Sequence, residues 1–488
     1  MKYFQYILFI ALLMSLFAME SCKKMLDEPV YSQLAPGNFL TTRDGIESVL
    51  NAAFSEAYFS GGFEHGVRNF GNQCTDIEWE TGGGENRGAV QMINFTWDAS
   101  LAEFEVYWER EYRAIRNANE VLDHVGNVTS MTDQEKTLCS AEARFVRALS
   151  YAHLYDWFGP VPLRSSEADT LELSRATKDE VQSFIASELL AIIPELPDPG
   201  KEANYGRPNK GAAMALLCKF YLNTKQWQKC ADMAQKIIGL NDYKLYPEYA
   251  DLFKVENERN KEFILVDPQI PNGSGNWYIN GAFPPGFYKD PVSGLTMQSN
   301  WNNWAAQYRL YDAFYNSFGP GDKRKSLIIS RYINKAGDTV SLLNSNDTRS
   351  FKYWPDPNAI SNNHGNDVPE IRFADILLSR AEALNEIEGP NQESIDLINE
   401  VRERAGLSDL LLSDFTSKDM LRNHLLKERG WEFYNERAIR RQDQIRMGTF
   451  ISSAIARGHA NAKPYMVLFP IPQQSMDSNP KLVQNSGY

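Results

Sequence analysis

The sequence predicts a mainly α-helical protein in which tetratricopeptide-like helix pairs form a scaffold and long, irregular, loop-rich insertions form a ligand-binding face. Three observations predict this class. Apolar residues recur at helical spacing along much of the chain, and small residues stand where paired helices must approach closely. Two long stretches rich in Gly, Asn, Pro and aromatic residues break this periodicity. We expect a single compact fold over residues 38–488.

The N-terminal segment has the features of an export signal. Lys2 precedes an almost unbroken apolar run from Ile7 to Met19, which is too short to span a bilayer comfortably. The following Ser and Cys22 resemble the cleavage and lipidation site of bacterial lipoproteins, although Glu20 departs from the commonest form of that site. We expect residues 1–21 to be a signal peptide and Cys22 to carry acyl chains that anchor the protein to a membrane. The alternative is an unmodified cysteine in a cleaved leader.

Residues 22–240 carry the first group of predicted helices. A polar tether leads to a capping sequence at Thr41 and Thr42, and Thr177 ends a second capping sequence. Apolar periodicity predicts helices over residues 46–57, 108–122, 133–158, 181–193, 210–222 and 226–238. The last two form a hairpin that approaches the tetratricopeptide pattern.

Two stretches interrupt the helices. Residues 60–100 and 268–368 lack periodicity and are rich in aromatic residues, and a short strand is predicted over 262–266. A long stretch of this kind in a compact protein is usually functional or disordered, and its aromatic content argues against disorder. We therefore assign the ligand-binding segment to residues 241–369.

Residues 370–488 return to the helical pattern. The stretch from Ile371 to Leu407 predicts a helical hairpin, broken at Gly389 and Pro390 and ended by Gly406. Alanines at positions 374, 381 and 383 allow close approach of a second helix. Two more helices are predicted between residues 418 and 446, followed by a tail rich in Pro and Asn.

Composition and motifs exclude several classes of function. A net charge of −13 argues against a nucleic-acid partner, which requires a basic surface. The sequence has no HExxH, GxSxG or GxxxxGK motif, and its cysteines lack the spacing of a metal or redox site. Glu105 and Glu109 share a helical side, as paired carboxylates of a glycoside hydrolase would, but Arg113 predicts a salt-bridged solvent face instead. We expect a protein that is not an enzyme and uses no cofactor or metal.

Candidate ligand-binding residues lie in both aromatic-rich stretches. In the first, Asp76, Glu78 and Glu80 alternate with Ile77 and Trp79, so an extended chain places the three carboxylates on one side. These carboxylates suit hydrogen bonds to sugar hydroxyls, and a solvated strand edge is the alternative.

In the second stretch, the strongest candidates are Trp277, Tyr278, Trp301 and Trp304, with Tyr288 among the surrounding aromatics. Flat aromatic rings stack on the C–H faces of sugars, and neighbouring amides hydrogen-bond their edges. The spacing of Trp301 and Trp304 also fits burial on one helical face.

Four motifs, in order, carry a family resemblance over nearly the whole mature chain: residues 141–163, the helix entry at 174–177, residues 372–383 with 399–407, and the ending at 469–488. On these motifs the chain resembles the SusD/RagB family of outer-membrane, nutrient-uptake lipoproteins of Bacteroidetes. Two positions depart from the family pattern, Arg437-Ala438 before the paired arginines and Ser486 near the end.

The resemblance implies a surface-exposed, lipid-anchored glycan-binding protein of the outer membrane. Its partner would be a SusC-like TonB-dependent transporter, reached through the helix pairs and the hairpin over residues 371–407. The resemblance also implies Trp97 as a platform aromatic, for which core packing is the alternative. Peptide binding of the RagB type, a glycoside hydrolase and a purely protein-binding repeat adaptor are the other functions considered.

Overall fold

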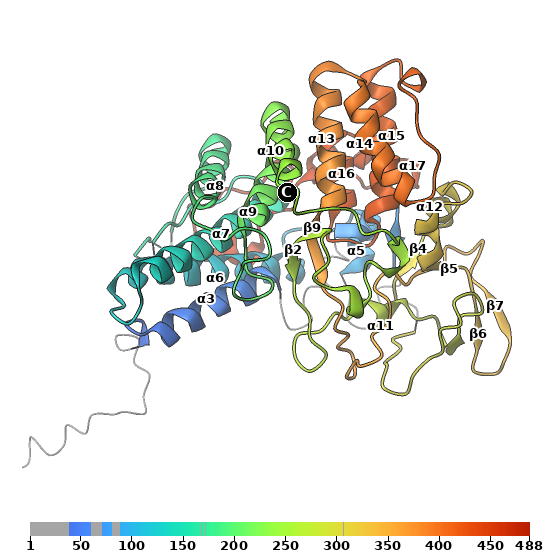
Figure 1. Ribbon diagram of the computed structural model, residues 1–488, viewed down its shortest axis with the longest axis horizontal. Helices are drawn as coiled ribbons and strands as arrows, with labels where there is room; N and C mark the ends of the chain where they lie inside the picture. Colours follow the sequence, from blue (N-terminus) through green and yellow to red (C-terminus); the bar gives the residue numbers. More distant parts are fainter. Residues whose placement is uncertain (1–38, 60–70, 81–87, 167, 171, 306) are drawn as a thin grey trace, which may run out of the picture.

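The computed structural model describes residues 39–59, 71–80, 88–166, 168–170, 172–305 and 307–488. A curved row of helices crosses the molecule, and a loop-rich part with short strands lies beside the C-terminal helices (Figure 1). The row consists of α3 (Arg43–Ala57), α6 (Ala102–His124), α7 (Asp133–Phe158), α8 (Lys178–Ile192), α9 (Lys210–Asn223), α10 (Trp227–Gly239), α13 (Phe373–Glu388) and α14 (Gln392–Arg404). Each helix packs against its neighbours in this order. The predicted fold class is confirmed.

Local capping explains where several helices begin. Thr132 and Thr177 each accept the backbone N–H of a glutamate three residues ahead, whose side chain accepts the N–H of the threonine in return. Thr42 caps α3 by accepting the N–H of Gly45. The caps predicted at Thr42 and Thr177 are therefore confirmed.

The predicted hairpin over residues 371–407 is confirmed as α13 and α14. Gly389 ends α13 with φ 97°, and Gly406 follows α14 with φ 78°, a conformation that glycine adopts without strain. The three alanines of α13 noted in the sequence are completely buried. α13 also packs against α10, where Arg380 donates a hydrogen bond of 2.6 Å to the carbonyl of Ala231. The small residues thus serve close helix packing.

The loop-rich part contains more regular structure than the sequence predicted. Its strands and helices are β1 (Glu78–Trp79), β2 (Phe263–Asp267), α11 (Tyr278–Ala282), β3 (Phe287–Lys289), β4 (Arg309–Leu310), α12 (Asp312–Ser317), β5 (Ile328–Ile329), β6 (Arg331–Asn334), β7 (Thr339–Ser341), β8 (Arg349–Ser350) and β9 (Val368–Arg372). The antiparallel pairs are β1–β4, β2–β9, β5–β8, β3–β6 and β6–β7. The predicted strand over 262–266 is β2. Reading all of 268–368 as irregular was wrong, because strands this short show no alternation in the sequence.

Two hydrophobic cores divide the molecule. The first lies among the helices, and the second lies within the loop-rich part. Strand β2 belongs to both: Ile264 and Leu265 pack in the first core, while Phe263 and Val266 pack in the second. The loop-rich part therefore has a packed interior of its own, which fixes the segments that carry its surface residues.

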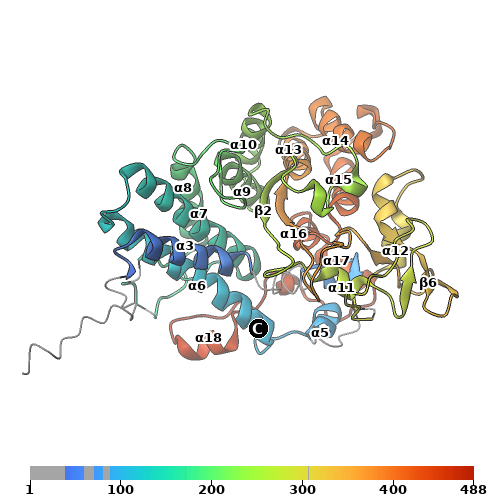
Figure 2. The same cartoon turned by 60° about the horizontal axis from the view of Figure 1, so that its bottom comes forward.

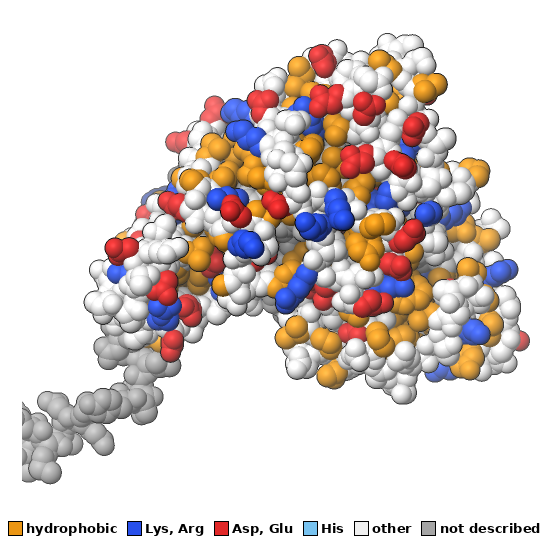
Figure 3. All heavy atoms as spheres, viewed as in Figure 1, with side chains coloured by type: hydrophobic (Ala, Val, Ile, Leu, Met, Phe, Trp, Pro, Cys, Tyr) orange, Lys and Arg blue, Asp and Glu red, His pale blue; other side chains and the backbone are white. Residues whose placement is uncertain are grey.

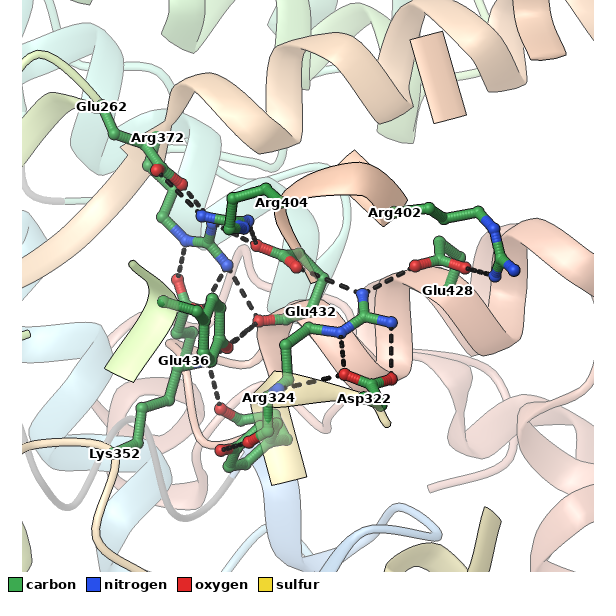
Figure 4. A network of polar contacts seen from close by, with 12 residues as sticks. Glu262, Asp322, Arg324, Lys352, Arg372, Arg402, Arg404, Glu428, Glu432 and Glu436 are labelled. Carbon is green, nitrogen blue, oxygen red and sulfur yellow. Dashed lines mark hydrogen bonds and ion pairs between the residues drawn. The ribbon is translucent and has the colours of Figure 1, made fainter. Parts of the chain in front are cut away.

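Buried ion pairs connect this part to the C-terminal helices (Figure 4). Glu432 of α15 (Lys418–Phe433) pairs with Arg372 at 2.6 Å, and Glu428 pairs with Arg324 at 2.6 Å. The buried network balances five basic against five acidic side chains: Arg324, Lys352, Arg372, Arg402 and Arg404 with Glu262, Asp322, Glu428, Glu432 and Glu436. Because each charge is paired, the desolvation cost of burying it is offset.

The remaining helices and the 3₁₀ turns complete the fold. They are α5 (Ala89–Asn94), α16 (Ile439–Arg446), α17 (Phe450–Ala456), α18 (Gln473–Ser478) and the 3₁₀ turns Val125–Asn127, Tyr249–Asp251, Val255–Asn257, Lys323–Leu327, Leu412–Asp414 and Pro464–Val467. α18 packs against α6, and both come forward in Figure 2. Asn485 ties the tail to the scaffold by donating to the carbonyls of Phe158 and Phe469. Among the described residues, no helix is both long and apolar enough to cross a membrane.

Candidate functional site

Three of the ten tryptophans stand apart from both cores. Trp79, Trp277 and Trp304 are partly exposed and belong to neither core nor to the layer packed against it. The other tryptophans lie in or against a core: Trp97, Trp108, Trp157, Trp227, Trp301, Trp354 and Trp431. Because burying a large aromatic ring is strongly favourable, rings kept outside the cores indicate a use at the surface.

Trp277 and Trp304 form a pair. Their ring centroids are 6.1 Å apart, and their planes are nearly perpendicular at 88°. Trp277 precedes α11, and the backbone N–H of Trp304 donates to the carbonyl of Asn280 within α11 at 2.8 Å. Two segments far apart in the sequence are therefore held together at this point.

Neighbouring asparagines fix the orientation of both rings. The indole N–H of Trp277 donates to Oδ1 of Asn363 at 2.6 Å, and that of Trp304 donates to Oδ1 of Asn362 at 3.1 Å. The amide of Asn302 also donates to Asn362 Oδ1, at 2.7 Å. The result is an aromatic corner framed by neutral amides, which suits a ligand with apolar faces and hydroxyl edges.

Trp79 occupies a second position. Strand β1 pairs with β4, which sets Trp79 opposite Arg309, and the guanidinium lies 4.9 Å from the centre of the indole ring. Tyr311 stacks near the same indole at 6.5 Å, and the indole N–H donates to the carbonyl of Asn346 at 2.7 Å. Since Trp79 already has cationic and aromatic neighbours, the Trp277 and Trp304 pair is the better candidate platform.

The acidic residues predicted around Trp79 turn inward. Glu78 is completely buried and accepts a hydrogen bond of 3.0 Å from the hydroxyl of Tyr278, and Glu80 is also buried. Asp76 pairs with Arg440 at 2.7 Å. Burial by itself raises the pKa of Asp76, but the charge and hydrogen bonds of Arg440 outweigh burial, so the pKa lies below its usual value. The expectation of a solvated strand edge is therefore wrong. The carboxylates hold the loop to the scaffold, and their contact with ligand stays a prediction.

Three predicted aromatics lie in the interior. Trp97 packs among Phe95 and Phe469, and its indole N–H donates to the hydroxyl of Tyr488 at 2.8 Å, which is the core role given as its alternative. Tyr278 stacks on Tyr308, and Trp301 stacks on Phe283. Buried rings offer little surface to a ligand, so any part they play in binding is to support the residues above them.

Tyr288 lies at the surface. It belongs to β3 and is 49% exposed, so its ring is available to a ligand.

Cys22 lies outside the described residues, so its lipidation stays a prediction. Glu109 pairs with Arg113 at 3.4 Å, while Glu105 accepts from Ser475, so the salt bridge predicted in place of a carboxylate pair is confirmed at Glu109.

Asn362 and Asn363 were missed in the sequence. They sit in an Asn- and Gly-containing run like many others, and they lie about sixty to ninety residues from the indoles that they hold. Only the folded chain shows that this run returns to the tryptophan pair. The doubled Asn between Ser361 and His364 was the available signal, but it also fits an ordinary turn.

A hollow lies elsewhere, between α6 and α18. Its volume is about 580 Å³, and Trp108, Tyr112, Arg116 and Arg164 are among its lining residues. Trp108 is buried, so its ring exposes little surface to this hollow. This hollow is an alternative ligand site to the tryptophan pair.

Comparison with known proteins places the whole chain in one group. Residues 223–488 match the model of the SusD family, and residues 41–222 match a model described as starch-binding and associating with the outer membrane. The chain is 26% identical to SusD-like protein P25 of Formosa agariphila over the full length of both proteins. It is 25% identical to the starch-binding protein SusD of Bacteroides thetaiotaomicron, covering 83% of this chain and 82% of that protein.

Solved structures agree with this placement. A laminarin-binding SusD-like protein superposes with a TM-score of 0.77 at 25% identity, over 92% of this chain and all of that one. Surface glycan-binding protein A of Bacteroides thetaiotaomicron, in complex with laminarihexaose, superposes with a TM-score of 0.73 at 19% identity, over 91% of this chain and 99% of that one. The second likeness supports the fold alone.

Proposed function

The chain belongs to the SusD family, and we propose from this premise that it captures oligo- or polysaccharide at the cell surface and delivers it to a SusC-like TonB-dependent transporter. Capture is by stacking and hydrogen bonding, without catalysis. The names of its relatives, one starch-binding and one laminarin-binding, support a glycan as the ligand class.

The observation that carries this proposal is the pair of tryptophans outside both cores. Trp277 and Trp304 are partly exposed, and each indole N–H is already bonded to an asparagine oxygen. The rings are thus held in place before any ligand arrives, which reduces the entropy lost on binding. Sugar C–H faces stack on such rings, while sugar hydroxyls exchange hydrogen bonds with the amides around them.

The membrane anchor and the transporter complete the proposal. The model that matches residues 41–222 is described as associating with the outer membrane, which supports an outer-membrane location. We assign lipidation to Cys22 and transporter contact to the helix pairs, including α13 and α14. Mass spectrometry of the protein from membranes tests the lipid on Cys22. Co-purification of a TonB-dependent transporter with a tagged form tests the partner.

Calorimetric titration of the purified protein against a panel of polysaccharides, oligosaccharides and peptides tests the ligand class. We expect at least one glycan to bind, and the Trp277→Ala/Trp304→Ala variant to lose that binding while remaining folded. Binding of peptides without any glycan would overturn the glycan assignment in favour of peptide uptake. Incubation with the bound glycan, followed by product analysis, tests for catalysis, because only a hydrolase predicts shorter chains.

A further inference from the structure

The tryptophan pair lies where three segments without Asp, Glu, Lys or Arg meet. Residues 268–288, 291–308 and 357–366 contain no Asp, Glu, Lys or Arg. At the 23% charged content of the whole chain, segments of this combined length would hold about eleven charged residues. Figure 3 shows acidic and basic side chains interspersed over both the helical and the loop-rich parts of the face it draws, as on an ordinary soluble surface. The neutrality of these segments is therefore local.

Hydrogen bonds bring the three segments together. Asn280 of the first accepts the N–H of Trp304 from the second, and its side-chain amide donates to the carbonyl of Asn362 in the third at 2.8 Å. Asn276 and His364 pair their backbones, which joins the first segment to the third once more. The neutral stretches of sequence thus build one neutral surface, with Trp277 and Trp304 upon it.

The ionisable groups nearest in sequence are already engaged or buried. Asp290 is buried and accepts the N–H groups of Val292 and Ser293 in a turn. Arg309 pairs with Asp347 at 3.2 Å. His364 is completely buried, and this burial lowers its pKa to about 3, so the ring is neutral at physiological pH. Lys289, in the short interruption between the first two segments, is a partly exposed cation.

Two amide oxygens beside Trp304 retain capacity for a hydrogen-bond donor. Oδ1 of Asn280 and Oε1 of Gln307 are buried and accept no hydrogen bond within the part of the chain that the structure describes. Hydroxyl groups and water can donate to these oxygens. Carboxylate and sulfate groups cannot, because they only accept.

We propose that the Trp277 and Trp304 surface selects neutral glycans and rejects those that carry carboxylate or sulfate groups. This inference rests on the proposed function. An anionic sugar held here would lose hydration without gaining a cationic partner, and such a loss is costly. The net charge of −13 adds a repulsion that acts on polyanions at longer range.

Charge-matched ligands test this selection directly. The panel contains neutral glucans, galactomannan and xylan, with polygalacturonate, alginate and a sulfated galactan as anionic members. Each polymer that binds is also prepared with its charge changed on the same backbone. Oxidation of primary hydroxyls adds carboxylates to a neutral polymer, and reduction of uronic acids to sugars removes them from an anionic one. Titrations compare the wild-type protein with the Trp277→Ala/Trp304→Ala variant.

We expect only neutral polymers to bind in a manner that requires the two tryptophans, and oxidation to weaken that binding at least about ten-fold, or about 1.4 kcal/mol. The affinity should change less than about two-fold between about 0.1 and about 1 M NaCl, since salt screens only charged contacts. Lys289→Ala should bind the neutral glycan as the wild type does.

An anionic polymer whose binding requires the two tryptophans, and weakens as salt rises, would overturn the inference while leaving glycan capture intact. Loss of binding in Lys289→Ala would also overturn it, because a cation would then take part in recognition. Failure of every polymer, neutral or anionic, would overturn the proposed function itself, and this inference with it. An anionic polymer bound equally by wild type and double variant would lie at another surface, so the neutral selection at this one would stand.

Discussion

The interior beside α15 and the surface around Trp277 use opposite chemistry. The buried network balances five basic against five acidic side chains in the space between the helices and the loop-rich part. The tryptophan surface is built from segments with no such side chains and leaves aromatic rings outside the cores. Charge lies where segments must be joined, and neutral aromatic groups lie where a ligand is expected.

This difference separates stability from recognition. A buried ion pair fixes the relative position of the segments that contribute its members, and removing one partner leaves an uncompensated charge. A partly exposed ring contributes little to folding but offers stacking area to a sugar. Substitutions in the buried network should therefore lower the free energy of unfolding, and substitutions at the tryptophan surface should lower glycan affinity.

The largest effect is expected from Arg372→Met. Arg372 is buried and pairs with Glu262, Glu432 and Glu436 at distances from 2.6 to 2.9 Å. Removing the guanidinium leaves five buried acidic side chains facing four basic ones, so one buried negative charge is uncompensated and we expect the free energy of unfolding to fall by about 3–5 kcal/mol. Denaturant unfolding measures this fall.

Arg43→Ala is the matched control. Arg43 is 37% exposed and pairs with Glu135 at the surface, where solvent screens the pair, so its loss should lower the free energy of unfolding far less than the loss of Arg372 does. Equal losses for the two arginine variants would mean that burial of the network makes no difference to its contribution.

Trp301 and Trp304 provide a second matched pair, because they lie three residues apart in the same Asn-rich run. Trp301→Ala opens a cavity in the second core and should destabilise the protein by about 3–5 kcal/mol. Trp304→Ala should change stability by less than about 1 kcal/mol but weaken glycan binding at least about ten-fold. Unfolding and calorimetric titration of both variants measure these effects. A large stability loss in Trp304→Ala would contradict its assignment to the surface.

Acid should weaken folding while leaving recognition unchanged. Burial by itself raises the pKa of Glu370 and Glu428, but Arg437 and Arg324 beside them lower it to about 2. Because these folded-state pKa values lie below the unfolded value of about 4.5, their stabilisation is present above pH 4.5 and is lost as pH falls toward 2. Each contributes on the order of 3 kcal/mol.

Denaturant unfolding measured from pH 6 to about 2 should show the free energy of unfolding falling as the pH drops below about 4.5. Glycan affinity should stay constant between about pH 5 and 8, because the three segments that carry the tryptophan surface contain no Asp, Glu, Lys or Arg and burial lowers the pKa of His364 to about 3. A titrating step in affinity within that range would show that an ionisable group takes part in binding.

The smallest effect is expected from Asn362→Ala. Oδ1 of Asn362 accepts from the indole of Trp304 at 3.1 Å and from Asn302 at 2.7 Å. Its removal frees the ring to rotate, so affinity should fall about three- to ten-fold, in line with a lost hydrogen bond of about 1 kcal/mol. Asn358→Ala, at an exposed asparagine of the same segment, is the control and should bind as the wild type does. Equal affinities of the two variants would remove Asn362 from the site.

The helical scaffold was predictable because its signals are local. Periodicity and caps such as Thr177 act within a few residues, so the sequence shows them directly. The same holds for Gly406, whose position after α14 needs only local geometry.

The ligand surface was only partly predictable. Trp301 and Trp304 lie three residues apart and each follows an asparagine, and their different burial depends on distant partners, such as the carbonyl of Asp356 that accepts from the Trp301 indole. The roles of Asn362 and Glu432 depend in the same way on contacts across the fold. A sequence shows which residues can hydrogen-bond, but tertiary packing decides which of them meet.

Fluorine NMR of the protein labelled with 5-fluorotryptophan tests the central claim most directly. Ten tryptophans give ten resonances, which single substitutions assign. On addition of the neutral glycan identified by calorimetry, the account predicts that the resonances of Trp277 and Trp304 shift while that of Trp108, in the groove beside α6, does not. A shift of Trp108 with Trp277 and Trp304 unchanged would contradict the account and move the ligand site to that groove.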